Sequence, residues 1–345
     1  MSSTVAVKAF AEGVTQQIKD YLPEEYQNMQ CTLTEQQKNN GVVLTGIVLN
    51  MPGRQISPVV YMEPFYDQVR KGEPMDRIMN CIADVCRQSL SVRELPESLD
   101  FTDYDSVKDY LTVQVINTKA NQRMLSGVPH KEMEDLSVIC RIEFPSPTGE
   151  GTGSIKVTHE MMSQWCVRPE EVYQKAVENA VKNSPPVLMS MDDLMMEIMG
   201  LPFEAKNLLQ LEAGAEFPKD GMYVLSNPMR LNGSSVLAYP NLQEQLESVF
   251  PQGCYLLPSS VHEMIIIPKD LSMTPKEMGE MVREVNQKEV SRDEILSDRV
   301  YEFDKEKRQL RQVPESIEKK RRWSDEKTKC GNLIPAEPER GGGTG

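Results

Sequence analysis

The sequence predicts an α+β protein with mostly antiparallel sheets and packed amphipathic helices, followed by a disordered C-terminal tail. Three observations support this class. Apolar strand runs and helical repeats alternate without the regular strand–helix–strand rhythm of a doubly wound sheet. Turn sequences rich in Asn, Gly, Pro and Ser separate neighbouring strand runs, as they do in hairpins. After Pro314 the apolar periodicity stops, so little can offset the entropy of ordering the chain.

The predicted elements fall into two halves and a tail. Residues 1–148 are expected to form an N-terminal α+β half and residues 149–313 a C-terminal α+β half. The glycine- and proline-rich stretch PSPTGEGTG marks the boundary between them. Residues 314–345 are predicted to be a disordered basic and glycine-rich tail.

The N-terminal half begins with a helix and a hairpin. Apolar side chains at helical spacing indicate the helix, and these are Val7, Phe10, Val14, Ile18 and Leu22. Strands over 29–36 and 42–50 flank Asn40-Gly41, a pair that supplies the positive φ angles of a tight turn. The segment QISPVVYMEPFY then predicts a short strand that runs into a helix near Pro64.

The remainder of this half and the first residues of the next predict two helices and three strands. Apolar residues at helical spacing follow Pro74 over 75–86, and a short helix is expected over 103–109. LTVQVI and LSVICRIEF predict strands, and the second is apolar enough to lie centrally in its sheet. A return strand, SIKV, follows the glycine-rich turn.

The C-terminal half predicts capped helices and four further strands before a closing hairpin. Thr158 and Ser190 are expected to cap helices, with a long helix over 172–181 between them. GMYVLSN, SSVLAYP, CYLLP and VHEMIIIP predict strands, and a helix is expected over 242–250. Thr274-Pro275-Lys276-Glu277 forms a capping box that starts another helix. DRVYEFD and RQLRQV predict the hairpin.

Composition favours a cytoplasmic protein. The formal net charge is −14, which keeps the protein soluble and repels nucleic acid from the folded body. The seven cysteines are odd in number and contain no C-x-x-C, a pattern that indicates a reducing compartment. The N-terminal segment lacks the continuous apolar core of a signal peptide, and no stretch approaches the roughly 18 uncharged apolar residues of a membrane span.

Motifs for phosphate and metal binding are incomplete. The GEGTGS segment from Gly149 to Ser154 departs from G-x-G-x-x-G, and it leads into a strand instead of a helix N-terminus. His130, His159 and His262 have no ligand-type partner at helical spacing. We therefore predict no cofactor and no metal.

Two segments concentrate reactive side chains. LPSSVHE holds Ser260 and His262, which strand alternation would place on one face, with Glu263 on the other, so a local triad is disfavoured. YMEPFY places Tyr61 and Glu63 at a strand-to-helix junction. These four, Ser260, His262, Glu63 and Tyr61, are the candidate catalytic residues. The alternative interpretations are a polar turn, a capping carboxylate and aromatic core packing.

Three functional hypotheses remain open. The missing catalytic constellation and the 21 methionines favour a non-enzymatic module that binds another protein. The alternative is a hydrolase-like enzyme in which Ser260 and His262 meet Tyr61 or Glu63 in a cleft. A third hypothesis assigns nucleic-acid contact to the basic run of the tail, Lys319, Lys320, Arg321 and Arg322. No membrane association is expected.

Longer stretches resemble a known family. ISPVVYMEPFYDQVRKGEPMDRIMNCIADV, MYVLSNPMRLNGSSVLAYPNLQEQLESVFPQGCYLLPSSVHEMIIIPKD and LSDRVYEFDKEKRQL are similar to the bacterial domain-of-unknown-function family numbered 5688, over about residues 30–313. The resemblance implies a cytosolic protein of anaerobic gut bacteria. That family has no established activity, so the resemblance assigns no catalytic role. Residues that match its pattern are Tyr61, Glu63, Pro64, Asn227, Tyr239, Pro258, Ser259, Ser260, His262 and Glu263.

Overall fold

The computed structural model describes residues 3–53, 57–91, 99–145, 152–202, 206–211 and 221–315. Its strands pair in antiparallel fashion, and helices pack against the sheets, which confirms the predicted α+β class. The basic run and almost all of the predicted tail lie outside the described residues, as do residues 149–151 of the GEGTGS segment. Within the described segments, no helix combines the length and hydrophobicity needed to cross a membrane.

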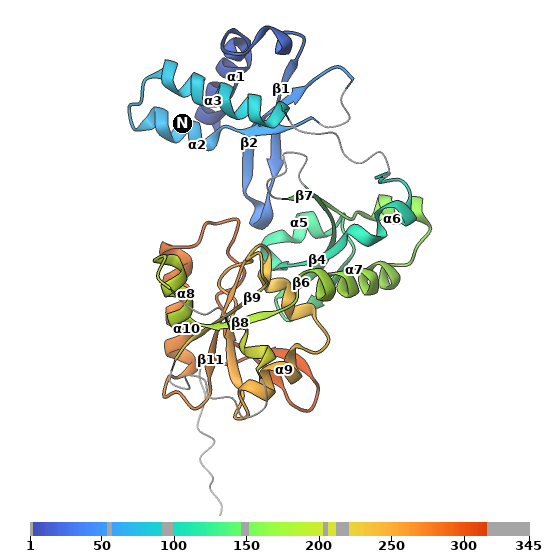
Figure 1. Cartoon of the computed structure of the whole chain (residues 1–345), viewed down its shortest axis with the longest axis vertical. Coiled ribbons are helices and arrows are strands. Elements are labelled where there is room, and N and C mark those ends of the chain that lie inside the picture. Colours follow the sequence, from blue (N-terminus) through green and yellow to red (C-terminus); the bar gives the residue numbers. More distant parts are fainter. Residues whose placement is uncertain are drawn as a thin grey trace, which may run out of the picture.

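An N-terminal lobe stands at one end of the molecule (Figure 1). Its sheet has the order β1-β2-β3. Buried side chains of the helices and of the inward-facing strand positions, such as Ile47 and Leu49, form its core. The elements of this lobe are α1 (Ser3–Gln17), η1 (Ile18–Tyr21), η2 (Glu24–Tyr26), β1 (Gln30–Gln37), η3 (Asn39–Gly41), β2 (Val43–Asn50), β3 (Val59–Tyr61), α2 (Glu63–Arg70) and α3 (Met75–Leu90).

The rest of the described chain forms a larger body with two sheets. In the first, β6 is central as predicted, because β4 pairs with one edge and both β5 and β7 pair with the other. Helix α7 covers one face of this sheet. The elements are α4 (Tyr104–Val107), η4 (Lys108–Tyr110), β4 (Leu111–Asn117), η5 (Lys119–Asn121), α5 (Gln122–Leu125), β5 (His130–Met133), β6 (Leu136–Pro145), β7 (Thr152–Lys156), α6 (His159–Trp165) and α7 (Pro169–Asn183).

The second sheet of the body has the order β13-β12-β10-β11-β9-β8. Figure 1 shows α8 and α10 on one side of it, with α9 near its lower edge. The elements are β8 (Val187–Ser190), α8 (Met191–Ile198), η6 (Leu208–Gln210), β9 (Tyr223–Ser226), η7 (Gly233–Ala238), α9 (Leu242–Val249), β10 (Cys254–Leu257), β11 (Met264–Pro268), α10 (Pro275–Lys288), β12 (Tyr301–Asp304) and β13 (Gln309–Gln312).

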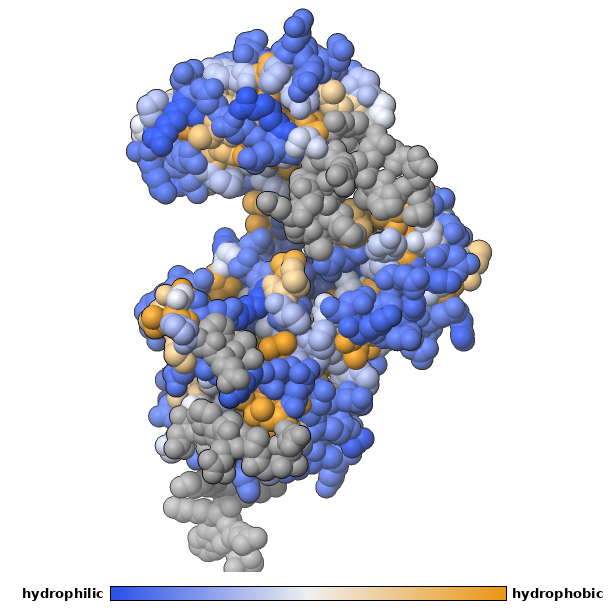
Figure 2. All heavy atoms as spheres, in the orientation of Figure 1, coloured by the Kyte–Doolittle hydropathy of each residue, from blue (hydrophilic) through white to orange (hydrophobic). Residues whose placement is uncertain are grey.

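The N-terminal lobe and the body each have a large hydrophobic core of their own. One contains residues between Val7 and Leu90, and the other draws on both body sheets between Leu99 and Leu310. Figure 2 shows a recess in the surface between the lobe and the body. The body core includes side chains from both sides of residue 149, and the division of the chain into halves at that point stays a prediction.

Local helix-start signals are confirmed. The Thr158 hydroxyl accepts the N–H of Met161, and the Ser190 hydroxyl accepts the N–H of Asp193. Thr274 and Glu277 form both hydrogen bonds of the capping box at the start of α10. These bonds join residues three positions apart, so the sequence alone is enough to predict them.

Two strand predictions are corrected. SSVLAYP forms the 3-10 helix η7, because the Ser234 and Ser235 hydroxyls donate to distant carbonyls of Val261 and Val113 and hold the backbone in a turn. VHEMIIIP enters a strand only at Met264. The strand-alternation argument about His262 therefore does not apply.

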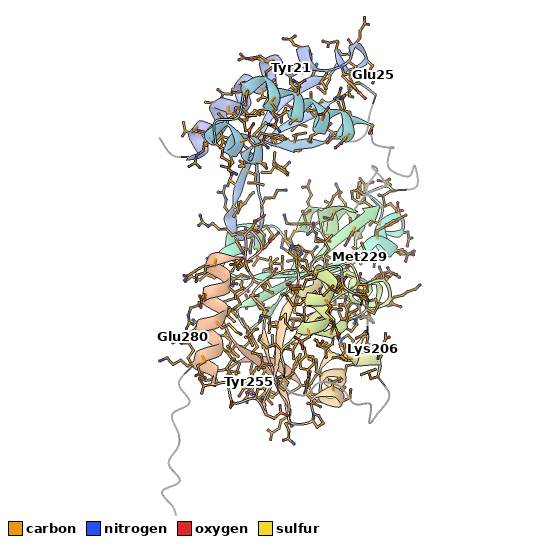
Figure 3. The ribbon with its side chains drawn as sticks, turned by 60° about the vertical axis from the view of Figure 1, so that its left-hand side comes forward. Tyr21, Glu25, Lys206, Met229, Tyr255 and Glu280 are labelled. Atoms are coloured by element: carbon orange, nitrogen blue, oxygen red, sulfur yellow. The ribbon has the colours of Figure 1, made fainter. Side chains whose placement is uncertain are left out.

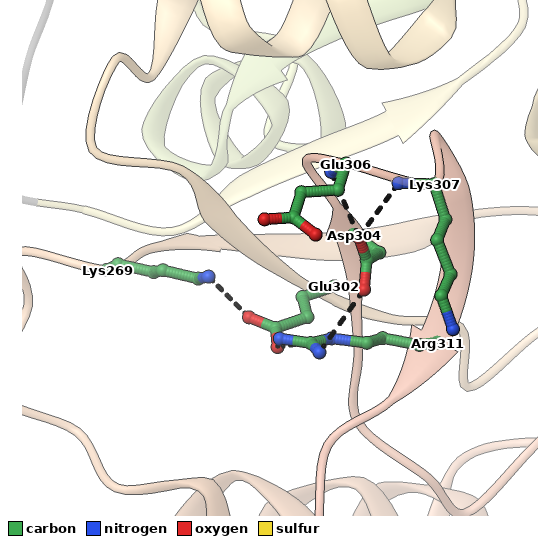
Figure 4. A network of polar contacts seen from close by, with 6 residues as sticks. All are labelled: Lys269, Glu302, Asp304, Glu306, Lys307 and Arg311. Carbon is green, nitrogen blue, oxygen red and sulfur yellow. Dashed lines mark hydrogen bonds and ion pairs between the residues drawn. The ribbon is translucent and has the colours of Figure 1, made fainter.

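The closing hairpin of β12 and β13 is confirmed, and it carries a charged network (Figure 4). Glu302 forms ion pairs with Lys269 and with Arg311, whose Nη2 lies 2.6 Å from Glu302 Oε1. Burial opposes ionisation of Glu302, but the hydrogen bonds from Lys269 and Arg311 outweigh it and lower the pKa of its carboxyl. The network ties β13 and the end of β11 to β12.

Candidate functional site

The loop of the β1–β2 hairpin attaches the N-terminal lobe to the body. Asn40 and Gly41 have positive φ angles of 55° and 68°, as the Asn-Gly pair predicts. Asn39 Nδ2 donates to the carbonyl of Asp293 at 2.7 Å. Asn40 Nδ2 donates to the carbonyls of Arg292 and Ile295, at 2.9 and 2.6 Å. The turn therefore makes tertiary contacts in addition to reversing the chain, and Figure 1 shows the hairpin reaching down to the body.

A buried asparagine of the body completes this attachment. Asn121 is fully buried, and its Oδ1 accepts the backbone N–H of Asn40 at 2.9 Å. Its Nδ2 donates to Asn40 Oδ1 at 3.0 Å, so the Asn121 side chain bonds to both the backbone and the side chain of Asn40. Buried amides are normally satisfied by hydrogen bonds. Asn121 Nδ2 also donates to the carbonyl of Asn117 at 2.9 Å, and the docked hairpin supplies the donor to Oδ1 and a second acceptor for Nδ2.

Tyr61 and Glu63 lie in the N-terminal lobe. The Tyr61 hydroxyl donates to Gln36 Oε1 at 2.7 Å, and Lys38 Nζ lies 4.1 Å from the centroid of the Tyr61 ring. Glu63 is the first residue of α2, and its Oε1 accepts the N–H of Thr45 at 2.6 Å. Glu63 therefore ties α2 to strand β2, and its other oxygen, Oε2, is buried without a hydrogen-bond partner.

Ser260 and His262 lie in the body, on the connection between β10 and β11. The Ser260 hydroxyl accepts the backbone N–H of His262 at 3.1 Å. On the ring, Nδ1 accepts the N–H of Asn232 at 3.2 Å, and Nε2 lies 3.4 Å from Glu294 Oε1. A serine nucleophile needs an imidazole nitrogen free to take its proton. Both ring nitrogens face other groups, so this geometry does not support the hydrolase hypothesis.

Both segments lie next to the hairpin loop, but among the described residues no hydrogen bond or ion pair joins one segment to the other. Tyr61 touches Lys38 at the start of the loop. His262 faces Glu294, whose neighbours Asp293 and Ile295 accept the hydrogen bonds of Asn39 and Asn40. The structure thus gathers the two segments at the junction of lobe and body, and it does not bring the four candidates into one catalytic cluster.

A polar network that the sequence reasoning missed extends from His262 into the first sheet of the body. Asn232 donates its N–H to His262 and accepts from Gln114 Nε2 at 2.9 Å. Arg141 Nη1 in turn donates to Gln114 Oε1 at 2.7 Å. The sequence does contain an indication of this network, because Gln114 and Arg141 lie inside the otherwise apolar segments LTVQVI and LSVICRIEF. Polar side chains buried in such strands need hydrogen-bond partners.

Two cavities lie elsewhere in the body. One of about 470 Å³ lies between α7 and the first sheet and includes Val138 and Cys140 in its wall. A neighbouring cavity of about 380 Å³ shares Lys131, Val138 and Tyr173 with it. Burial raises the pKa of the Cys140 thiol to about 12, so this cysteine is not a nucleophile at neutral pH. None of the four predicted catalytic residues lines either cavity.

Metal-ligating side chains do not cluster in the part of the chain that the structure describes. No three His, Cys, Asp or Glu residues within it are grouped so that they could hold an ion. The predictions of no metal and no cofactor stay predictions.

The fold and the junction define an α+β protein in which two hydrophobic cores are joined by a docked hairpin and a polar network. The model of the family of unknown function DUF5688 matches residues 7–305, and the chain belongs to that family, as the resemblance predicted. Searches of curated proteins and of solved structures found no match.

Proposed function

We propose that this chain is a non-enzymatic protein-interaction module whose partner binds an exposed methionine-rich patch. The observation that carries the proposal is the exposure of six large apolar side chains on two adjacent segments. The methionine-rich patch consists of Met195 (44% exposed), Ile198 (68%), Met199 (64%), Leu201 (50%), Met229 (72%) and Leu231 (42%).

Backbone geometry and one ion pair hold these side chains together. Gly200 has a positive φ of 65° after α8, and the N–H of Leu201 donates to the carbonyl of Met196 at 2.9 Å. This C-terminal turn folds the residues after α8 back against the helix. Arg230 forms an ion pair with Glu197, which places Met229 and Leu231 beside α8. Figure 2 shows apolar atoms on the surface where Figure 1 places α8, and Figure 3 labels Met229.

The chemistry of the patch indicates the kind of partner. Single exposed apolar residues are normal, but a contiguous group marks an interaction site. Methionine side chains are flexible and polarizable, so they adapt to varied apolar surfaces. Helix α8 carries three acidic residues and no basic one. We therefore expect an amphipathic helix of another protein, with apolar anchors against the patch and Lys or Arg along its edge.

The cysteines support the proposed cytoplasmic location. All six cysteines among the described residues are free, and Cys86, Cys140 and Cys254 are buried. Free thiols are typical of proteins that work in a reducing compartment. The partner is accordingly sought among soluble cytoplasmic proteins.

The test compares native pull-downs with three versions of the full-length chain. We expect the wild type and the control Met75→Ser, which changes an exposed methionine on α3 far along the chain from the patch, to capture the same stoichiometric partner. The double variant Ile198→Ser/Met229→Ser should lose it. Equal capture by the double variant, or no partner with the wild type, contradicts the proposal.

Self-association must be distinguished from binding of a different protein. Sedimentation of the purified wild type over a range of concentrations provides this control. A dimer that the double variant abolishes would show that the patch binds a second copy of the chain, and this result would overturn the proposed partner.

A further inference from the structure

We infer that Arg141, Lys156 and Lys38 form a binding site for a small phosphate-bearing anion where the N-terminal lobe meets the body. Arg141 on β6 and Lys156 on β7 lie directly opposite each other in the antiparallel ladder. Like charges at directly opposed positions destabilise a sheet. A bound anion would neutralise the pair and relieve this repulsion.

The three cations lack carboxylate partners. Among the residues that the structure describes, none of them forms an ion pair, although the basic side chains of Arg230, Lys269 and Arg311 all do. Glu143 lies on the same strand face as Arg141, and its charge acts favourably on the guanidinium without an ion-pair contact. Neighbouring cations without carboxylate partners in a protein of net charge −14 indicate a specific role.

Neutral groups hold the guanidinium of Arg141 in place. Its Nη1 donates to Gln114 Oε1 at 2.7 Å, and its Nη2 donates to Ser154 Oγ. Its Nε is buried and has no hydrogen-bond partner. Burial also lowers the pKa of Arg141, which records the cost of keeping this charge away from water. An anion would compensate that cost and give the unused donors a partner.

Lys156 and Lys38 bring charge from both sides of the junction. Burial, then Arg141, then Lys38 lower the pKa of the Lys156 ammonium, so the hairpin lysine acts on the β7 lysine electrostatically. Figure 1 shows the β1–β2 hairpin reaching the body, where its loop contacts η5. The site is therefore completed only when the hairpin is docked.

The charge of the site selects the ligand. Three positive charges exceed what one carboxylate can neutralise, whereas a phosphate group carries close to two negative charges and several acceptor oxygens. Arginine binds phosphate in a bidentate manner, and lysine adds a point charge. The Tyr61 hydroxyl and Gln36 lie beside Lys38 and supply polar neighbours for the rest of the ligand.

The test is calorimetric titration of the full-length protein with pyrophosphate in phosphate-free buffer. We expect saturable binding by the wild type, and binding at least about tenfold weaker for Lys156→Gln and for Lys38→Gln, because each loses a charge-assisted contact. The control Lys276→Gln removes an exposed lysine of α10 and should bind as the wild type does. No binding at millimolar pyrophosphate, or equal binding by all variants, overturns the inference.

Thermal melting provides a second readout that a purely structural role would not produce. Without ligand, Lys156→Gln should melt at the same or a higher temperature than the wild type, because it removes the repulsion with Arg141. With pyrophosphate, only the wild type and the Lys276→Gln control should gain in melting temperature. A lower melting temperature for ligand-free Lys156→Gln, or tight binding of a single-stranded oligonucleotide without binding of pyrophosphate, contradicts a small-anion site.

Discussion

Replacing Asn40 should weaken the attachment of the N-terminal lobe to the body. Its side chain takes part in three hydrogen bonds, two as donor to Arg292 and Ile295 and one as acceptor from Asn121. Asn40→Gly removes all three and keeps the positive φ of the turn, since glycine adopts that conformation without strain. Asn40→Ala removes the same bonds and also strains the backbone.

The magnitude follows from these bonds. Each contributes a net stabilisation of about 0.5–1.5 kcal/mol, and partial exposure of the loop favours the lower values. We expect Asn40→Gly to reduce the free energy of opening the junction by about 2 kcal/mol. Asn40→Ala should cost about 1 kcal/mol more, because a residue with a Cβ is forced into the left-handed region.

Hydrogen exchange measured by mass spectrometry checks this prediction. A loss of about 2 kcal/mol corresponds to roughly 30-fold faster exchange of amides protected by the docked loop. Peptides covering 38–42 and 119–121 should show it, and peptides from α10 should not. Asn50→Ala is the control, because its side chain makes one long, exposed contact of 3.4 Å on the same hairpin. Unchanged exchange at residues 119–121 in both Asn40 variants would refute the reasoning.

Three further predictions concern the body. Glu302→Gln should destabilise the protein by about 1–2 kcal/mol at pH 7 in urea unfolding, because two partly exposed cations lose their partner. The control Glu280→Gln, which removes an exposed carboxylate, should cost less than about 0.5 kcal/mol. The folded-state pKa of Glu302 is lowered from its ordinary value of 4.5. The stability that ionised Glu302 contributes is therefore fully present above pH 4.5 and is lost as the pH falls through the folded-state pKa. The unfolding free energies of the variant and the wild type should accordingly converge in acid. Tyr301→Phe removes a buried hydroxyl that is bonded to a carboxylate and should cost about 1–3 kcal/mol in the same assay; a change below about 0.5 kcal/mol would contradict the network. In the native protein at pH 8, iodoacetamide should label exposed Cys166 and spare Cys140, whose thiol pKa is raised to about 12 by burial; equal labelling in a peptide map would disprove this.

Local chemistry accounts for the parts of the fold that the sequence could predict. The caps of Thr158, Ser190 and Thr274 depend on a neighbour three residues away, and the Asn40-Gly41 turn depends on the φ angles of two residues. SSVLAYP could not be assigned in this way. Its Ser235 hydroxyl bonds to Val113, 122 positions earlier in the chain, and this tertiary bond overrides an apolar run that resembles a strand.

The junction could be predicted only in part for the same reason. The segments around Tyr61 and His262 stood out by composition, and both lie next to the docked loop. The partners that decide their chemistry come from elsewhere, since Asn232 occupies one ring nitrogen of His262 and Glu294 faces the other. That Arg141 and Lys156 lie opposite each other could be predicted only if the register of β6 and β7 were known, and the sequence does not specify it.

The separation of the two large cores has a consequence for how the chain is made on the ribosome. Among the residues that the structure describes, the N-terminal core uses none beyond Leu90, so it can close soon after that segment emerges. The body core needs Leu310, and the buried hydroxyl of Tyr301 bonds to Asp135. At elongation rates of roughly 5–20 residues per second, the finished lobe waits on the order of 10–40 s for that partner core. During this interval the Asn39–Asn40 loop is displayed without its docking surface, and a nascent chain arrested before residue 301 should bear a folded lobe and an open hairpin.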